Sequence, residues 1–263
     1  MTPRSPRISW ISIVPVKGLR MQTREEALLT RDGIPGDRAF FVVDRTDTMI
    51  SATRLGPLVA VVAEHDARTG ELSLRFPDGR EVAGEVELGD PEEVGFAGET
   101  VPARTVLGPF SPALSDHCDR PVRLVSAAGE RPGVDRGRDG AVTLLSIASL
   151  ERLRAQAGEL EPVDARRFRM NLGVAGLEAH EEDDWVDREI RVGDALLRVA
   201  GHVGRCAATT RNAETGVVDF ETLHHLQAYR GRLLTTEPLP FGVHARVVEP
   251  GRVRLDDPVT VAA

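Results

Sequence analysis

Short runs of apolar residues, separated by glycine, proline and aspartate, fill the first hundred positions of this sequence. These runs lie at 8–16, 39–44, 58–64, 72–76 and 81–88. A strand presents every second side chain to one face, and turn residues between runs this short favour hairpins over helical crossovers. The sequence therefore predicts a barrel or sandwich here, rather than a series of βαβ units.

The second half of the chain mixes strands with a few helices. We expect helices at 111–119, 147–157 and 219–229. Ser146 is the predicted N-cap of the second one, because a serine hydroxyl there accepts a hydrogen bond from an amide of the first turn. The remaining strands are predicted at 121–125, 188–200 (a hairpin turned by Gly193-Asp194), 243–248 and 252–261.

A second alternating run predicts one more strand. Phe168, Met170, Leu172 and Val174 recur at every second position, which would place Arg169 and Asn171 together on the opposite face. Before this strand, the glycine-rich segment 127–140 is expected to form a mobile loop or lid. Taken together, these patterns predict a mainly β protein with a few helices (α+β), divided into residues 1–110 and 111–263.

Composition narrows the classes of function. The net charge is −8 and the cations are dispersed among the acids, which disfavours a broad nucleic-acid surface. No apolar run approaches the roughly 20 residues that span a bilayer, and no secretory apolar core follows the N-terminus, so we expect a cytoplasmic protein without a membrane partner. Two cysteines, Cys118 and Cys206, make no disulfide framework, so both thiols are expected to be free.

Two residues have unusual chemical settings. Lys17 is the single lysine among 33 lysine and arginine residues. Since the two side chains are not interchangeable, this indicates that the function requires an ammonium group at position 17. Cys206 directly follows Arg205, and a neighbouring cation favours the thiolate, the form that binds soft metals or attacks electrophiles. On residue chemistry alone, a buried packing role for Cys206 stays open.

A series of short motifs gives a more specific indication. They are Ile13-Val-Pro-Val-Lys17-Gly18, Gly36-Asp-Arg38, Ile50-Ser-Ala-Thr-Arg54, Leu145-Ser146-Ile-Ala-Ser149-Leu150, Arg167-Phe-Arg169-Met-Asn171, and Arg205-Cys206 followed by Thr209-Thr210. Their order resembles the MOSC family, the molybdenum-cofactor sulfurase C-terminal domain preceded by an N-terminal β-barrel partner. The layout is most similar to the amidoxime-reducing components of mitochondria and their bacterial counterparts. The resemblance runs from about residue 8 to the last strand.

This resemblance implies a fold and a set of site residues. The fold is a β-barrel MOSC domain over 111–263, packed with a smaller N-terminal β-barrel-like domain over 1–110. The implied cofactor is the molybdenum cofactor (molybdopterin), and Cys206 matches the catalytic cysteine that ligates molybdenum. A pterin with a phosphate needs converging cations and hydrogen-bond donors. The residues implied to bind it are Lys17, Arg38, Ser146, Arg169, Asn171, Arg205 and Thr209.

The resemblance also implies an activity. A MOSC protein of this layout is an oxidoreductase that reduces N-hydroxylated or other N-oxygenated small molecules. Two cysteines cannot ligate an ordinary four-cysteine iron–sulfur cluster, so electrons would come from a separate electron-transfer protein or reductase. His202 and Asp219 are candidate proton donors, although structural roles are favoured for both. One departure is Gly18, where a serine often follows the lysine.

Two alternatives stay open. Cys206 could carry a persulfide in a sulfur carrier or transferase, or the protein could carry the cofactor without turnover.

Overall fold

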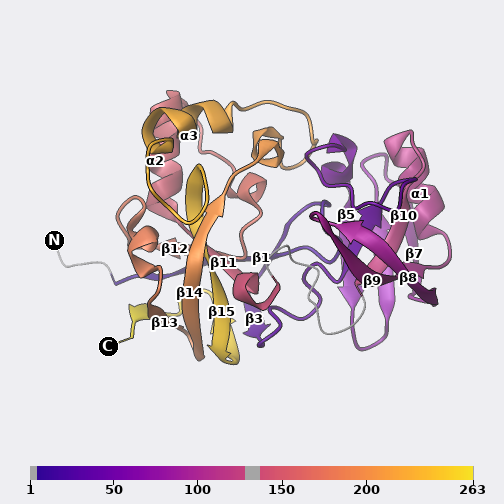
Figure 1. The fold of residues 1–263 in the computed structure, drawn as a ribbon, viewed down its shortest axis with the longest axis horizontal. Coiled ribbons are helices and arrows are strands. Elements are labelled where there is room, and N and C mark those ends of the chain that lie inside the picture. Colours follow the sequence, from indigo (N-terminus) through magenta and orange to yellow (C-terminus); the bar gives the residue numbers. More distant parts are fainter. Residues whose placement is uncertain (1–4, 128–136, 263) are drawn as a thin grey trace.

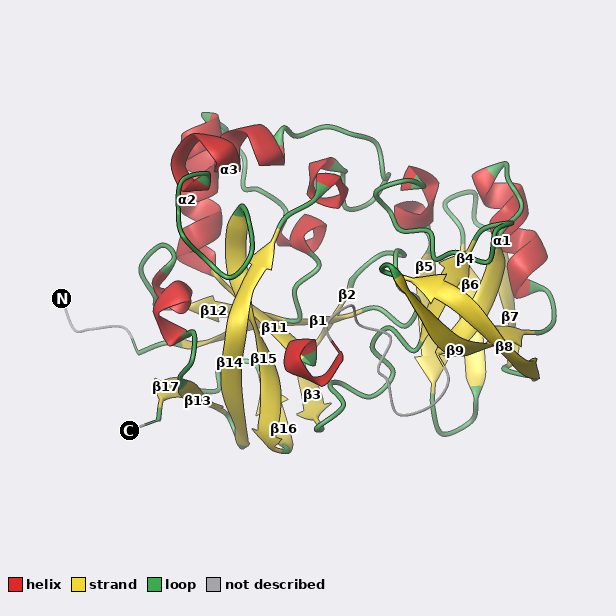
Figure 2. Ribbon diagram, viewed as in Figure 1, coloured by secondary structure: helices red, strands yellow, loops and turns green. Residues whose placement is uncertain are grey.

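The computed structural model describes residues 5–127 and 137–262, which form two lobes side by side (Figure 1). The large lobe is built on an eight-stranded sheet, and the small lobe on a four-stranded and a three-stranded sheet. Strands dominate both lobes, and three α-helices are found among the described residues (Figure 2). The predicted fold class, mainly β with a few helices, is confirmed.

The large lobe contains one mixed sheet and one additional strand pair. In spatial order the sheet consists of β17 (Val259–Val261), β13 (Glu189–Val192), β14 (Ala195–Gly204), β15 (Pro240–Glu249), β11 (Val142–Ser146), β12 (Leu172–Ala175), β1 (Arg7–Ile13) and β2 (Gln22–Arg24). The additional pair joins β16 (Gly251–Arg254) to β3 (Glu26–Leu29). β11 and β12 run parallel, and the order of the sheet is open rather than closed into the predicted barrel.

The small lobe has two antiparallel sheets and one helix. Its strands are β4 (Phe40–Val43), β10 (Arg123–Ala127), β9 (Glu99–Val106) and β8 (Leu88–Phe96) in one sheet, and β5 (Val62–Asp66), β6 (Glu71–Arg75) and β7 (Glu81–Glu85) in the other. All four residues of β4 are buried, as expected of a continuous apolar run. The helix α1 (Phe110–Cys118) buries Phe110, Leu114 and Cys118 in the same core, so Cys118 is a packing residue.

Each lobe contains residues from both sides of the division predicted at residue 110. β1, β2 and β3 lie in the sheets of the large lobe, whereas α1 and β10 complete the small lobe. Side-chain burial and strand pairing explain why these segments lie in the other lobe. Ile8 and Ile11 of β1 are fully buried in the core of the large lobe, and β10 supplies hydrogen-bonding partners for both β4 and β9.

Two helices lie together on the large lobe (Figure 2). They are α2 (Ile147–Ala157) and α3 (Thr222–Arg230). The hydroxyl of Ser146 accepts the amide of Ala148 at 3.1 Å, which confirms the predicted N-cap, and Gly158 ends α2 with a left-handed φ of 72°. Among the described residues, no helix combines the length and apolar character needed to cross a bilayer.

Several predicted elements differ from those observed. The strand predicted through Phe168, Met170, Leu172 and Val174 is wrong in its first half, because a 3-10 helix, η3 (Ala165–Phe168), comes first and Arg169 follows with a φ of 58°. Asp164 stabilises η3 by accepting the amide of Arg166 at 2.9 Å. Only residues 172–175 pair as a strand.

Three further differences concern the ends of elements. α3 begins at Thr222 rather than 219, because the backbone amides of Asp219 and Phe220 donate to the carbonyl of Thr210, at 3.1 and 3.3 Å. The strand predicted at 252–261 is split into β16 and β17 by a turn in which Asp256 has a φ of 65°. The lid predicted at 127–140 lies largely outside the described residues. The end of this segment is described and forms the 3-10 helix η2 (Gly137–Gly140).

A buried carboxyl group stabilises the start of α2 from outside the helix. Glu182, in the 3-10 helix η4 (Glu181–Trp185), is fully buried. Its Oε1 accepts the amide of Ser146 at 3.2 Å and the hydroxyl of Ser149 at 2.8 Å. Burial raises the pKa of Glu182 to about 7, although these hydrogen bonds act to lower it.

This raised pKa predicts that stability falls as the pH rises. Between the unfolded pKa of 4.5 and the folded value of about 7, the folded protein holds a proton on Glu182 that the unfolded chain has released. We therefore expect the free energy of unfolding to decrease by on the order of 3 kcal/mol across this window, a loss complete above about pH 7. Urea unfolding at several pH values between about pH 5 and pH 8 measures this decrease in the free energy of unfolding.

Two variants test the assignment to Glu182. Glu182→Gln keeps an acceptor at Oε1 and cannot ionise, so its unfolding free energy should depend less on pH than that of the wild type. Glu151→Gln, at a position on α2 whose side chain is 51% exposed, should retain the wild-type slope. An unchanged slope in Glu182→Gln would contradict the prediction.

Candidate functional site

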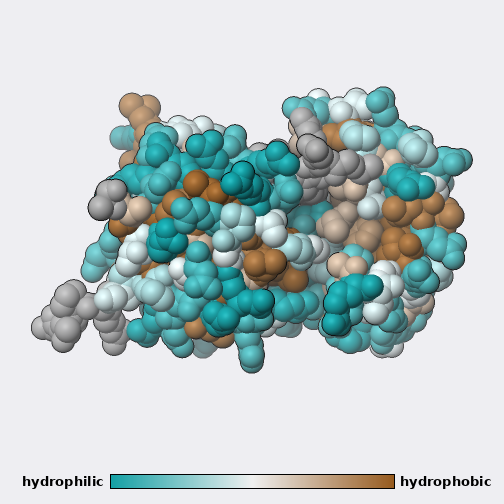
Figure 3. All heavy atoms as spheres, turned by 90° about the horizontal axis from the view of Figure 1, so that it is seen from below, coloured by the Kyte–Doolittle hydropathy of each residue, from teal (hydrophilic) through white to brown (hydrophobic). Residues whose placement is uncertain are grey.

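A pocket of about 400 Å³ lies between the two lobes, where a notch is visible on the face seen from below (Figure 3). Its described lining contains five cationic side chains and no Asp, Glu or His. The cations are Lys17, Arg38, Arg167, Arg169 and Arg205. In a chain of net charge −8, a lining of this kind favours an anionic ligand.

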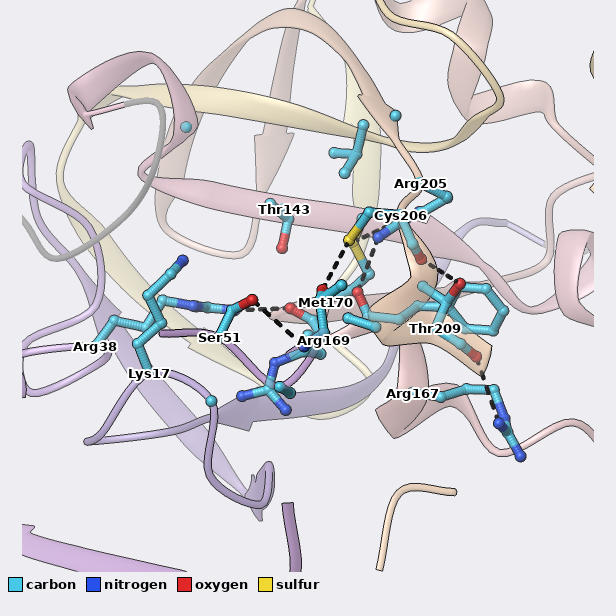
Figure 4. A pocket seen from close by; sticks show the side chains of 18 of the residues that line it. Lys17, Arg38, Ser51, Thr143, Arg167, Arg169, Met170, Arg205, Cys206 and Thr209 are labelled. Atoms are coloured by element: carbon cyan, nitrogen blue, oxygen red, sulfur yellow. Dashed lines mark hydrogen bonds between the residues drawn. The ribbon is translucent and has the colours of Figure 1, made fainter. Parts of the chain in front are cut away.

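Cys206 reaches this pocket from the end of β14 (Figure 4). It is exposed, whereas Cys118 is buried, so the packing role left open for Cys206 is excluded. The carbonyl oxygen of Cys206 accepts both the amide of Thr209 at 3.1 Å and its hydroxyl at 3.0 Å. Cys206 is the N-cap of the 3-10 helix η5 (Ala207–Thr210). The two bonds from Thr209 therefore restrain the turn that carries the thiol.

Two of the cationic residues have strained backbones. Arg38 has a φ of 53° and Arg169 a φ of 58°, a region that costs non-glycine residues on the order of 1–3 kcal/mol. The guanidinium of Arg38 donates to the carbonyl of Arg169 at 2.7 Å, and that of Arg169 donates to the carbonyl of Leu19 at 2.8 Å. Contacts between segments far apart in the sequence thus hold both arginines in place.

The electrostatic surroundings of Arg169 favour an incoming anion. Burial lowers the pKa of its guanidinium to about 10, and the nearby cation Arg38 contributes in the same direction. The carboxylate of Asp37 acts against this shift. Arg169 is still protonated at neutral pH, so a negative group beside it would relieve the cost of its burial.

A buried polar network supports these arginines from behind. Asp37 forms a short ion pair with Arg38 and accepts the side-chain amide of Asn171 at 2.9 Å. Its other oxygen accepts the amide of Val14 at 2.8 Å. The side-chain oxygen of Asn171 accepts the hydroxyl of Thr143 at 3.0 Å. Asn171 lines the pocket, and its side-chain amide donates to Asp37.

The remaining predicted residues divide into those that line the pocket and those that do not. Lys17 lines it, with Nζ 5.5 Å from the centre of the Phe96 ring. Arg205 also lines it, yet its guanidinium donates to the carbonyls of Phe168 and Phe241, each at 2.9 Å, and so holds the loop before Arg169. Ser146 is fully buried, caps α2 and is not part of the described lining.

Neither candidate proton donor lines the pocket. Nδ1 of His202 contacts the hydroxyl of Thr236 at 3.1 Å, and Asp219 is paired with Arg167. Both residues thus have the structural roles favoured from the sequence.

Two residues at or beside the pocket have no role that the sequence predicts. Asp37 lies within the Gly-Asp-Arg motif and Thr53 within the Ser-Ala-Thr-Arg motif, yet the sequence predicts no role for either. The hydroxyl of Thr53 lies 3.6 Å from the sulfur of Cys206. Gly18, the departure from the expected serine, has a φ of 97°, a conformation that favours glycine.

Comparison with protein families assigns both parts of the chain. Residues 131–260 match the MOSC domain, and residues 5–106 match the MOSC N-terminal beta barrel domain. The chain belongs to the MOSC family. Its β1, β2 and β3 fall within the match to the N-terminal domain, yet they pair with strands of the MOSC domain. The pocket therefore lies between the two domains of a MOSC protein.

Named relatives of this MOSC protein come from animals and plants. Mitochondrial amidoxime-reducing component 1 of Xenopus laevis is 28% identical over 96% of this chain and 81% of its own length. The human protein of that name is 33% identical over 44% of this chain and 35% of its own length. Molybdenum cofactor sulfurase of Oryza sativa subsp. japonica is 25% identical over 84% of this chain and 30% of its own length. The matched part thus spans about a third of the human and rice proteins.

Proposed function

We propose that this MOSC protein binds the molybdenum cofactor between its lobes and reduces N-oxygenated small molecules there. The observation that carries the proposal is the exposed thiol of Cys206 in a pocket lined by five cations and, among the described residues, no acid. The relatives named as amidoxime-reducing components and as a molybdenum cofactor sulfurase support it.

The chemistry of the lining fits such a cofactor. Thiolate sulfur is a soft ligand suited to a soft metal, and Cys206 would provide it. Guanidinium groups bind phosphate through paired hydrogen bonds, and an ammonium binds it as a point charge. Arg38, Arg169 and Lys17 would therefore hold the anionic parts of the pterin. The network around Asp37 would keep Arg38 oriented before the cofactor arrives.

The reaction would use this arrangement as follows. When bound, the cofactor would supply the two-electron chemistry that breaks an N–O bond. An N-hydroxyl compound, two electrons and two protons then give the corresponding N–H compound and water. Since the described lining holds no carboxylate or imidazole, we propose that the protons come from solvent. The electrons would come from a separate electron-transfer protein.

Metal analysis combined with a reductase assay tests this proposal. We expect close to one molybdenum per chain after expression in a host that makes the cofactor. We also expect an artificial electron donor to drive conversion of benzamidoxime to benzamidine. Molybdenum without turnover would instead indicate a cofactor carrier. A persulfide on Cys206 without molybdenum would indicate a sulfur carrier, and either result would overturn the proposed reductase.

A further inference from the structure

The sulfur of Cys206 has a polar neighbour from the other lobe. The hydroxyl of Thr53 lies 3.6 Å from this sulfur, within hydrogen-bonding distance for a sulfur atom. When the sulfur is a thiolate or a metal ligand it has no proton to give, so the hydroxyl of Thr53 must be the donor. The amide of Thr53 donates to the hydroxyl of Ser51 at 3.3 Å, which restrains the turn on which Thr53 lies.

One arginine ties the backbone of Thr53 to the segment that follows Cys206. Arg211 ends η5, and its guanidinium donates to the carbonyl of Thr53 at 2.9 Å and to the carbonyl of Gly216 at 2.8 Å. Because Cys206 is the N-cap of η5 and Arg211 its C-cap, the thiol and the guanidinium that binds the Thr53 carbonyl belong to one short segment. This bond restrains the backbone of Thr53 relative to the segment that carries Cys206.

The two lobes also meet without space for side chains beside this contact. A Cβ atom on Gly216 would lie 1.9 Å from the carbonyl oxygen of Gly56, and one on Gly56 would lie 2.5 Å from a guanidinium nitrogen of Arg211. Gly216 has a φ of 72°, which favours glycine for a second reason. The guanidinium of Arg20 donates across the same boundary to the carbonyl of Glu214 at 2.7 Å. These contacts fix the separation of the lobes at the level of Cys206.

We infer that Thr53 is a positioning residue for the sulfur of Cys206, and that Arg211 acts through Thr53 by holding it there. A hydroxyl that donates to a thiolate stabilises its charge and limits the directions its lone pairs can take. A residue of the small lobe would thus stabilise the thiolate form of Cys206 in the MOSC domain and orient its sulfur. The importance of that sulfur for catalysis rests on the proposed function, whereas the contact itself can be tested without any cofactor.

Thiol labelling of the cofactor-free protein with an aromatic disulfide reagent tests this inference. Thr53→Val keeps the shape of the side chain but removes the donor, so we expect Cys206 to be labelled about three- to tenfold more slowly at neutral pH. Thr53→Ser keeps a hydroxyl and should remain within about twofold of the wild type.

Arg211→Met separates direct from indirect action. If Arg211 acts by holding Thr53, Arg211→Met should slow labelling much as Thr53→Val does, and the double variant should be no slower than Thr53→Val. Additive effects in the double variant would show that Arg211 does not act through Thr53. Equal rates for the wild type and Thr53→Val would overturn the positioning role itself.

Cys118 provides an internal check on folding in each variant. It is buried in the core of the small lobe, and burial raises the pKa of its thiol to about 11. It should therefore stay unlabelled as long as that lobe is folded, giving one labelled thiol per chain. Where Thr53→Val or Arg211→Met exposes Cys118, the rate is compared at a lower temperature at which only one thiol is labelled. Failure of the proposed function would leave these rates unaffected, because no molybdenum is present.

Discussion

Replacement of Cys206 by alanine should lower kcat/KM for an N-oxygenated substrate by at least about a thousandfold, since the proposed soft ligand is removed outright. The molybdenum content should fall as well, to the extent that Cys206 contributes to retention of the cofactor. Steady-state kinetics with an artificial electron donor and elemental analysis of the same preparation measure both effects. The exposed position of Cys206 means that its replacement leaves no internal cavity.

Cys118→Ala is the matched control for this experiment. Cys118 is buried on α1 in the core of the small lobe and does not line the pocket. Its replacement should cost about 1 kcal/mol of stability through lost packing, with kcat/KM within about twofold of the wild type. Full molybdenum content and activity in Cys206→Ala would show that the ligand assignment is wrong.

Asp37→Ala, in the buried network behind the pocket lining, should be strongly destabilising. Only 3% of the Asp37 side chain is exposed, and its partner Arg38 is 10% exposed. Alanine would leave a buried guanidinium without its counter-charge and the amide of Val14 without its acceptor. The side-chain amide of Asn171 would keep only its bond to the carbonyl of Ser12. Removing one partner of a buried pair costs about 3–5 kcal/mol. Urea unfolding measures this loss, and retention of the cofactor should fall with it.

Two further variants separate the causes of this effect. Asp32→Ala also breaks an aspartate–arginine pair, at 2.7 Å to Arg138, but both side chains are more than half exposed, so the cost should be below about 1 kcal/mol. Asp37→Asn keeps acceptor capacity but loses the charge, and should be intermediate. An Asp37→Ala protein as stable as Asp32→Ala would refute the role assigned to the buried network.

Local signals account for much of the secondary structure. The N-cap of Ser146 and the left-handed Gly158 bound α2 at the residues predicted, and the apolar run at β4 gives a fully buried strand. The run from Phe168 to Val174 does not form a single strand, because a 3-10 helix and the left-handed Arg169 interrupt a pattern of period two. There the 3-10 helix capped by Asp164 determines the backbone conformation, although the apolar residues alternate as in a strand.

The candidate site could be located from the sequence in part. The motifs around Lys17, Arg38, Arg169 and Cys206 identified residues that the fold brings to one pocket. They could not show that the guanidinium of Arg205 binds backbone carbonyls, or that the hydroxyl of Ser146 serves a helix. Residue type shows what a side chain is able to bind, whereas its actual partner depends on which atoms lie beside it.

The sequence by itself determined the class of the fold, the capped elements and the residues able to bind an anion or a soft metal. These follow from backbone periodicity, capping and side-chain chemistry, which act over a few neighbouring positions. Only the tertiary structure decided that Asp37 meets Asn171, 134 positions away, and that Thr53 meets Cys206, 153 positions away. Such contacts arise where the two lobes pack together, and that packing depends on the whole buried surface rather than on any local pattern.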